Sequence, residues 1–163
     1  MHETEADLLW LDRLIDSSHQ AGGPHLQRVF QPQTRIGAEE LVALMTAMQV
    51  LSVATVSRQG RPMISAVDGF VYRGRWYFGS ALDSLKVIHL RARPWISLAH
   101  NRSDDLSVVV HGQAAFIDLA AGSNSGLAGM MADFYGSQWA PDPDAAYLVV
   151  EPERMFTFRN TYK

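Results

Sequence analysis

The sequence predicts a mainly β protein of the α+β class, an antiparallel β-barrel of about six to seven strands with flanking helices. Short apolar, β-branched segments follow one another from Val50 onward, and they are separated by turn sequences such as Arg58-Gln59-Gly60. Helical spacing of apolar residues is confined to the ends of the chain and to one inserted segment. Because strands and helices do not alternate, a hairpin-built barrel is favoured over a doubly wound α/β fold.

The first part of the chain is predicted to form one helix followed by an irregular arm. Residues 4–18 carry apolar side chains at helical spacing, and Thr4 with Asp7 three residues later is typical of a helix start. Gly22-Gly23-Pro24 interrupts this spacing, so the segment that follows is expected to be irregular. The chain is therefore divided into an N-terminal helix with an irregular arm over residues 1–36 and a barrel domain over residues 37–163.

The barrel domain is predicted to open with a helix over residues 38–49, where Leu41, Leu44, Met45 and Met48 recur at helical spacing. Its strands are bounded by glycine turns and by prolines, which are tolerated at the start of a strand. A further helix begins at Ser84 and stops before Pro94. The predicted strands cover residues 50–57, 61–72, 76–79, 95–100, 106–117, 146–151 and 155–159.

Composition excludes several classes of function. The chain has 163 residues, 47% of them hydrophobic, and a formal net charge of −3, which argues against a nucleic-acid or anionic membrane surface. The absence of cysteine excludes disulfides and thiolate metal sites, and no histidine pair has metal-site spacing, so no metal site is predicted. No apolar run approaches the ~20 residues that span a bilayer, and the N-terminus lacks a signal-peptide pattern, so a cytoplasmic protein is expected.

The segment from Val50 to Pro94 predicts a site for a phosphorylated small molecule. It contains three strands, two tight turns and then a helix whose first turn carries Ser84 and Lys86. The start of a helix has free backbone N–H groups and the positive end of the helix dipole, which favour an anion. Asp83 competes as a capping residue, and we expect it to point away while Ser84 faces the ligand.

Several short motifs occur in a recognisable order between Leu41 and Asp118. In chain order they are Thr55-Val56-Ser57, Gly60-Arg61-Pro62, Phe78-Gly79-Ser80, Ser84-Leu85-Lys86, Leu90-Arg91-Ala92-Arg93-Pro94 and Val109-Val110-His111-Gly112-Gln113-Ala114. Together they resemble the pyridoxamine 5′-phosphate oxidase-like superfamily of FMN-binding split β-barrels, which includes flavin and deazaflavin oxidoreductases. Each motif is weakly specific alone, and the ordered set is more specific for the fold than for the reaction.

The resemblance implies a homodimer with two flavin mononucleotides at its interface. It implies that the second strand lies along the flavin ring, here Met63, Ile64, Ser65, Ala66 and Val67, and that the phosphate is held by Gly79, Ser80, Ser84 and Lys86. The oxidases themselves carry serine-arginine-lysine where this chain has Ser84-Leu85-Lys86, so a bidentate phosphate partner is missing. Oxidation of vitamin B6 is therefore not expected, and a branch that uses a 5-deazaflavin coenzyme is at least as similar.

Other residues allow two interpretations each. His111 lies among valines and is either a cofactor neighbour or a satisfied buried histidine, and the other histidines are expected mostly at the surface. Asp68 is unusual in a strand and marks either a bulge before Gly69, which we favour, or the lining of a substrate cavity. Tyr135 and Trp139 either cover a cofactor or pack in the core.

The function predicted from these residues is an FMN-binding split-barrel oxidoreductase that transfers a hydride between the flavin and a small organic acceptor. Two alternatives remain open: a deazaflavin-dependent reductase of the F-420 type with the same fold, and a non-catalytic flavin- or haem-binding stress or sensor protein. No catalytic residue stands out, which agrees with chemistry carried by a cofactor. The predicted partners are a small-molecule cofactor, a small-molecule substrate and a second copy of the chain.

Overall fold

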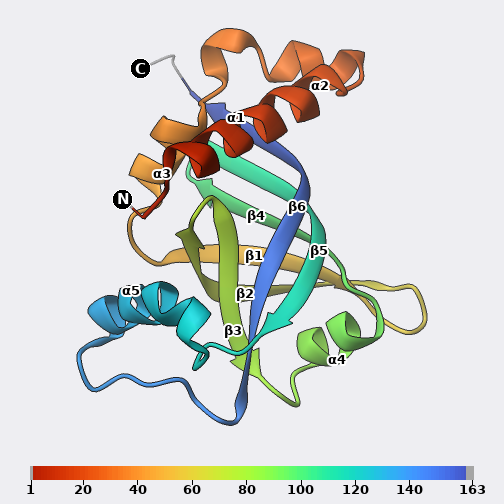
Figure 1. The fold of residues 1–163 in the computed structure, drawn as a ribbon. Coiled ribbons are helices and arrows are strands. Elements are labelled where there is room, and N and C mark those ends of the chain that lie inside the picture. Colours follow the sequence, from red (N-terminus) through yellow and green to blue (C-terminus); the bar gives the residue numbers. More distant parts are fainter. Residues whose placement is uncertain (1, 161–163) are drawn as a thin grey trace.

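The computed structural model describes residues 2–160 and contains a closed, six-stranded antiparallel barrel (Figure 1). The strands follow one another around the barrel in the order β1-β2-β3-β6-β5-β4. Their bounds are β1 (Gln49–Val56), β2 (Pro62–Tyr72), β3 (Arg75–Ala81), β4 (Trp95–Arg102), β5 (Leu106–Ile117) and β6 (Ala145–Arg159). The predicted fold class, a mainly β barrel of α+β type, is thereby confirmed.

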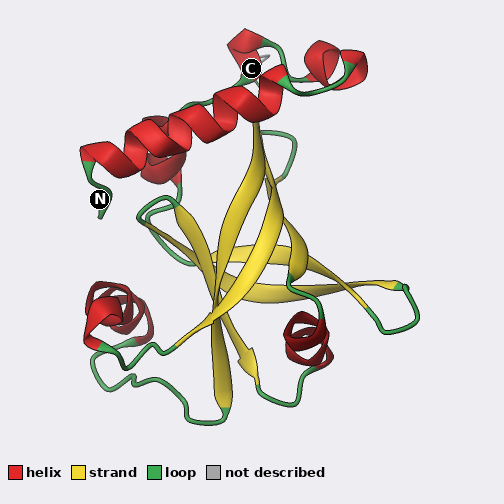
Figure 2. Ribbon diagram, turned by 45° about the vertical axis from the view of Figure 1, so that its right-hand side comes forward, coloured by secondary structure: helices red, strands yellow, loops and turns green. Residues whose placement is uncertain are grey.

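Helices cover both ends of the barrel. The first three, α1 (Glu5–Gln20), α2 (Pro24–Val29) and α3 (Ala38–Leu44), gather at one end, while α4 (Leu85–Ala92) and α5 (Ser125–Tyr135) lie apart from each other at the other end (Figure 2). Two short 3-10 helices, η1 (Pro32–Thr34) and η2 (Gly122–Asn124), complete the order. No helix within residues 2–160 is long and apolar enough to cross a membrane.

Three predicted segments differ from the structure. The arm expected to be irregular contains α2, which Pro24 starts at a first-turn position where its missing N–H costs nothing. Helix α3 ends at Leu44, because the chain then turns to begin β1 at Gln49. The last two predicted strands are one strand, β6, in which Pro152 pairs with Gly112 at a register shift where a proline is tolerated.

The N-terminal helix α1 shares a core with the barrel. Its Leu11 and Ile15 are almost fully buried and belong to one apolar cluster with Trp76 of β3, Val108 of β5 and Met155 of β6. Burial of a large apolar side chain contributes about 1.5–3 kcal/mol, so this helix adds substantially to the stability of the barrel end. The division into an arm over residues 1–36 and a barrel over residues 37–163 stays a prediction, and residues 1 and 161–163 lie outside the described part.

Replacing Ser18 with alanine is expected to lower the free energy of unfolding by about 1–3 kcal/mol. The buried N–H of Met155 donates to Ser18 Oγ at 2.9 Å and would lose its acceptor. The matched control is Ser17→Ala, because Ser17 is exposed and its hydroxyl, like that of Ser18, donates to the carbonyl of Leu14. Urea unfolding of both variants checks the prediction, and equal losses would contradict it.

Candidate functional site

The barrel is split between β2 and β3. These strands pair only from Gly69 to Tyr72 of β2, opposite Phe78 to Arg75 of β3. Beyond that point β2 pairs with β1 over Pro62–Gly69, while β3 pairs with β6 over Trp76–Ala81. In the described part of the chain, the edge of β2 over residues 62–68 that faces away from β1 is therefore not covered by another strand. Backbone N–H and C=O groups along this edge are available to a ligand.

The five β2 residues assigned to a flavin ring lie on this uncovered edge. Ile64 is 72% exposed and Met63 is 41% exposed, whereas Val67 is buried in the main core. Ser65 is half-buried and Ala66 is exposed, so no large side chain obstructs the middle of the segment. The edge offers mainly backbone atoms and apolar surface, which suits a flat, partly apolar ring.

Two hydroxyls and an ammonium meet where β3 leads into α4. Ser84 is the N-cap residue of α4, but its side chain makes no capping hydrogen bond; Ser84 Oγ instead lies 3.0 Å from Ser80 Oγ. Lys86 Nζ donates to Ser80 Oγ at 3.2 Å. None of the ion pairs among residues 2–160 includes Lys86, although its side chain is half-buried. A half-buried ammonium without a carboxylate, beside free helix N–H groups, can hold a phosphate or carboxylate.

Leu85 begins α4 between Ser84 and Lys86, and it is 61% exposed. The oxidases that this chain resembles carry an arginine at this position, and its planar guanidinium would bind two phosphate oxygens at once. A leucine supplies no donor, so the charge of this cradle comes from Lys86 and the helix start.

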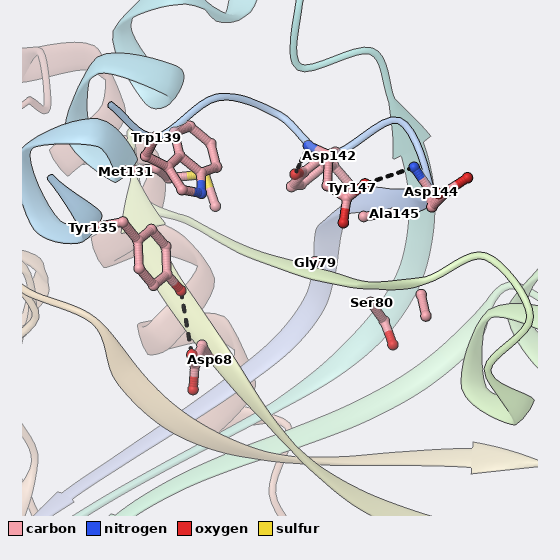
Figure 3. Close-up of a pocket in the computed structure, with 11 residues that line it drawn as sticks. Asp68, Gly79, Ser80, Met131, Tyr135, Trp139, Asp142, Asp144, Ala145 and Tyr147 are labelled. Atoms are coloured by element: carbon pink, nitrogen blue, oxygen red, sulfur yellow. Dashed lines mark hydrogen bonds between the residues drawn. The ribbon is translucent and has the colours of Figure 1, made fainter. Parts of the chain in front are cut away.

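A cavity of about 380 Å³ lies beside this cradle, between the split strands, α5 and the loop that leads into β6 (Figure 3). Gly79 lies in its wall, and a Cβ atom there would lie 3.1 Å from Tyr147 Cε1. Any larger residue at position 79 would therefore press on the Tyr147 ring. The remaining lining residues are Asp68, Ser80, Ala81, Met131, Tyr135, Trp139, Asp142, Asp144 and Ala145.

Asp68 lines this cavity and does not form a bulge. It pairs in regular register with Val50 of β1, so the bulge favoured from the sequence is wrong. Tyr135 of α5 points toward it, and the Tyr135 hydroxyl donates to Asp68 Oδ2 at 3.3 Å (Figure 3). Partial burial first, and then the charge of Asp68 and this hydrogen bond, raise the pKa of Tyr135 to about 12. The phenol is therefore neutral at physiological pH and acts as a donor.

Replacing Asp68 with asparagine is expected to lower the pKa of Tyr135 toward the ordinary value of about 10, because the nearby negative charge is removed. The raised pKa means that the folded state holds this proton more tightly than the unfolded state. The free energy of folding that the protonated Tyr135 phenol contributes is fully present below pH ~10 and is lost as pH rises through ~12. Tyrosinate absorbance, with Tyr135→Phe used to subtract the other tyrosines, measures the shift; an unchanged pKa would contradict the role of Asp68.

The histidines are distributed differently from the prediction. His19, His89 and His100 are buried, contrary to the expectation that most lie at the surface, and His89 Nδ1 lies 2.9 Å from Thr55 Oγ1. His111 is exposed, and its Nδ1 lies 2.8 Å from Ser97 Oγ in a separate cavity of about 350 Å³. Among residues 2–160, no group of three or more histidine or acidic side chains is arranged to hold a metal ion.

Sequence reasoning did not find Asp142, Asp144 and Tyr147 as lining residues of the cavity. Tyr147 OH accepts from the Asp142 N–H at 2.8 Å, and Asp142 Oδ1 accepts from the Asp144 N–H at 2.8 Å, so the loop is folded back on β6. The sequence signal was present in Pro141-Asp142-Pro143-Asp144, a loop that places acidic residues directly before a strand.

Comparison with known families agrees with this geometry. Residues 38–159, which include the complete barrel, match the family model for pyridoxamine 5′-phosphate oxidase. The chain belongs to the pyridoxamine 5′-phosphate oxidase family. Its barrel is therefore the family's split β-barrel, and the resemblance inferred from the ordered motifs is confirmed. A search of curated proteins finds no match.

Solved structures with the split barrel of the pyridoxamine 5′-phosphate oxidase family are similar at low identity. A conserved hypothetical protein of Mycobacterium tuberculosis has a TM-score of 0.65 at 14% identity, covering 79% of this chain and 88% of that chain. The heme storage protein HutZ of Vibrio cholerae has a TM-score of 0.61 at 16% identity, covering 74% and 93%. An F420 reductase has a TM-score of 0.55 at 17% identity, covering 70% and 94%. At these identities the likeness shows the fold alone.

Proposed function

We propose that this chain binds FMN in the split of its barrel and transfers a hydride between the flavin and a small organic acceptor. The observation that carries the proposal is the half-buried ammonium of Lys86, which has no carboxylate partner among the described residues and lies 3.2 Å from Ser80 Oγ at the start of α4. Such a group is stabilised by an anion, and the adjoining uncovered edge of β2 provides room for a flat ring.

The residues present fit a nucleotide with a terminal phosphate. Ser80, Ser84 and Lys86 would hold the phosphate, together with the backbone N–H groups at the start of α4. The backbone of β2 over residues 63–67 would donate to and accept from the ring. When bound, FMN supplies hydride transfer; the protein's part is to orient it and to keep its phosphate charge compensated.

Exposed apolar side chains on the outer barrel support self-association as a homodimer. Val56 of β1, Ile64 of β2 and Trp95 of β4 are 40%, 72% and 56% exposed, and these strands are neighbours in the barrel. Val56 and Trp95 line the same cavity as His111. A contiguous exposed apolar surface of this kind is typical of an interaction site. In a dimer the uncovered edge of β2 would also be shielded from water.

A deazaflavin coenzyme is the second candidate. Leu85 stands where the oxidases carry an arginine that can bind the FMN phosphate. An F420 reductase is among the proteins with a similar fold. The same cradle would then hold the phosphate of that coenzyme. The two candidates differ in spectrum, because bound FMN gives a yellow protein with two visible bands, whereas the deazaflavin is followed by the quenching of its own fluorescence.

Replacing Lys86 with alanine is expected to weaken FMN binding by about 1–3 kcal/mol, the contribution of a charge-assisted hydrogen bond. Titration of the purified protein with FMN, and in parallel with the deazaflavin, measures this. Lys86→Arg, which keeps the charge, is expected to retain part of the affinity. Arg28→Ala is the matched control, because Arg28 is an exposed cation on α2 at the other end of the barrel.

The same samples test the remaining parts of the proposal. Sedimentation of the FMN complex is expected to give a dimer at micromolar concentration, and a monomer with FMN bound would refute the shared site. An unchanged dissociation constant for Lys86→Ala would remove Lys86 from the site. A bound flavin that is reduced but never reoxidised by any acceptor tested would favour the non-catalytic alternative, and a Soret band after addition of haem would favour haem binding.

A further inference from the structure

We propose that the cavity of about 380 Å³ between β3, α5 and the loop before β6 is a binding site for an organic cation, a protonated or quaternary amine with an apolar or aromatic body. This assignment goes beyond the proposed function and does not depend on which cofactor the chain binds. It follows from the combination of aromatic walls and uncompensated carboxylates in one cavity of ligand size.

Aromatic rings form one side of the cavity. Tyr135 and Trp139 are stacked, with ring centroids 5.8 Å apart and an interplanar angle of 25°, and Tyr147 lines the opposite part of the wall (Figure 3). The faces of tryptophan and tyrosine attract cations through the ring quadrupole, and tryptophan is the strongest of the aromatic side chains in this respect. Met131 adds apolar surface to the same wall.

Three carboxylates from two different segments line the same cavity. Asp68 comes from β2, whereas Asp142 and Asp144 come from the loop before β6. No lysine, arginine or histidine is among the lining residues, and none of the ion pairs within residues 2–160 includes these three aspartates. A cleft lined by charge of one sign raises the local concentration of ligands of the opposite charge.

The hydrogen bonds of these carboxylates leave their charge in place. Asp68 accepts from the Tyr135 hydroxyl, and Asp142 accepts from the backbone N–H of Asp144. Both donors are neutral, and they orient the carboxylates without neutralising them. The Tyr135 phenol keeps its proton over the physiological range, so it adds no second negative charge next to Asp68.

A bare metal ion does not fit this arrangement. In the described part of the chain, no group of three acidic or histidine side chains is close enough to hold one. The carboxylates are instead distributed around a cavity whose volume lies within the roughly 300–1,000 Å³ that is typical of small-molecule sites. The geometry therefore favours an organic cation over a metal ion.

The cavity can be tested separately from the phosphate cradle. Ser80 borders both, but Ser84 and Lys86 do not line the cavity. The protein without added cofactor is titrated in a calorimeter at fixed ionic strength with three probes: benzyltrimethylammonium, benzyl alcohol and phenylacetate. Benzyltrimethylammonium is expected to bind more tightly than the alcohol, and phenylacetate least tightly. Equal binding of the cation and the alcohol, or no binding of the cation, would overturn the proposal.

Two variants assign the binding to this cavity. Asp68→Asn, which keeps the shape of the side chain, is expected to weaken cation binding by about threefold to fivefold, as for a partly exposed charge pair. Trp139→Ala is expected to weaken it by a similar factor of about threefold to fivefold through the lost cation–π contact. Thermal melting of both variants verifies that they are folded. If Trp139→Ala does not fold, Asp68→Asn alone decides the test.

The controls separate this site from general charge effects and from the cofactor. Glu39→Gln removes one exposed negative charge on α3 at the other end of the barrel and is expected to leave cation binding unchanged. Lys86→Ala, which is expected to weaken FMN binding, removes an ammonium that contacts Ser80 in the cavity wall, and it is expected not to weaken cation binding. A loss in Glu39→Gln equal to that in Asp68→Asn, or unchanged binding in Asp68→Asn, would show that the cavity does not bind the cation.

Discussion

Replacing Trp76 with alanine is expected to lower the free energy of unfolding by about 3–5 kcal/mol, the range for truncating a buried tryptophan. Trp76 is completely buried in the barrel interior. It pairs with Val71 of β2 and Val150 of β6 on either side of β3, and it belongs to the same core cluster as Leu11 of α1. The cavity left by its ring would therefore be bordered by three strands and by the helix that closes this end of the barrel.

Trp76→Phe is the matched variant for this prediction. Trp76 Nε1 is a buried side-chain donor that has no hydrogen-bond partner among residues 2–160. Phenylalanine retains most of the apolar volume and removes that unpaired donor, so it is expected to cost less than alanine. For a chain of this length, each kcal/mol corresponds to about 2–4 °C in Tm, so alanine should lower Tm by roughly 6–20 °C. A Tm for Trp76→Ala equal to that of Trp76→Phe would contradict the assigned packing.

Replacing Gly112 with alanine is expected to lower the free energy of unfolding by about 3 kcal/mol, at the upper end of the usual cost of overpacking. A Cβ atom at position 112 would lie 2.1 Å from the carbonyl oxygen of Glu151 and 2.9 Å from Cα of Pro152. Both contacts are with the backbone of β6, which cannot turn aside as a side chain can. The register shift between β5 and β6 would have to change, and with it the longest strand pairing in the barrel.

Gly129→Ala is the control for the Gly112 variant, since a Cβ atom at position 129 meets nothing within 4 Å. Gly129 lies in the interior of α5, where alanine is favoured over glycine by up to about 1 kcal/mol. The two variants make the same chemical change and are expected to shift stability in opposite directions in a urea or thermal melt. Loss of stability in both, or in neither, would refute the close approach at Gly112.

Local signals in the sequence were sufficient for most of the fold. The capping pair of Thr4 and Asp7 and the apolar spacing after it predicted α1, and both capping hydrogen bonds are present. Strand β5 begins and ends at the predicted residues, because it is long, β-branched and bounded by a polar turn. Two of the three segments that differ contain a proline: Pro24 begins a helix, and Pro152 lies within a strand at a register shift.

The part of the candidate site at the start of α4 could be predicted from local sequence. Ser84 and Lys86 were identified as a helix start with an anion-binding pattern, and the structure adds the contact of both with Ser80. The cavity was not predictable in the same way. Asp68 and Tyr135 are 67 residues apart, and only the packing of α5 against the split strands brings the hydroxyl to the carboxylate.

The sequence by itself determined most of the strands and helices in their order, the helix start with its lysine, and the family to which the chain belongs, because these depend on neighbouring residues and on ordered motifs. The tertiary structure alone decided that the split of the barrel lies between β2 and β3, and that Asp68, Tyr135, Trp139 and Asp144 line one cavity. The physical reason is that strand register and helix packing are set by long-range burial and hydrogen bonding, which bring distant residues together without leaving a local pattern in the chain.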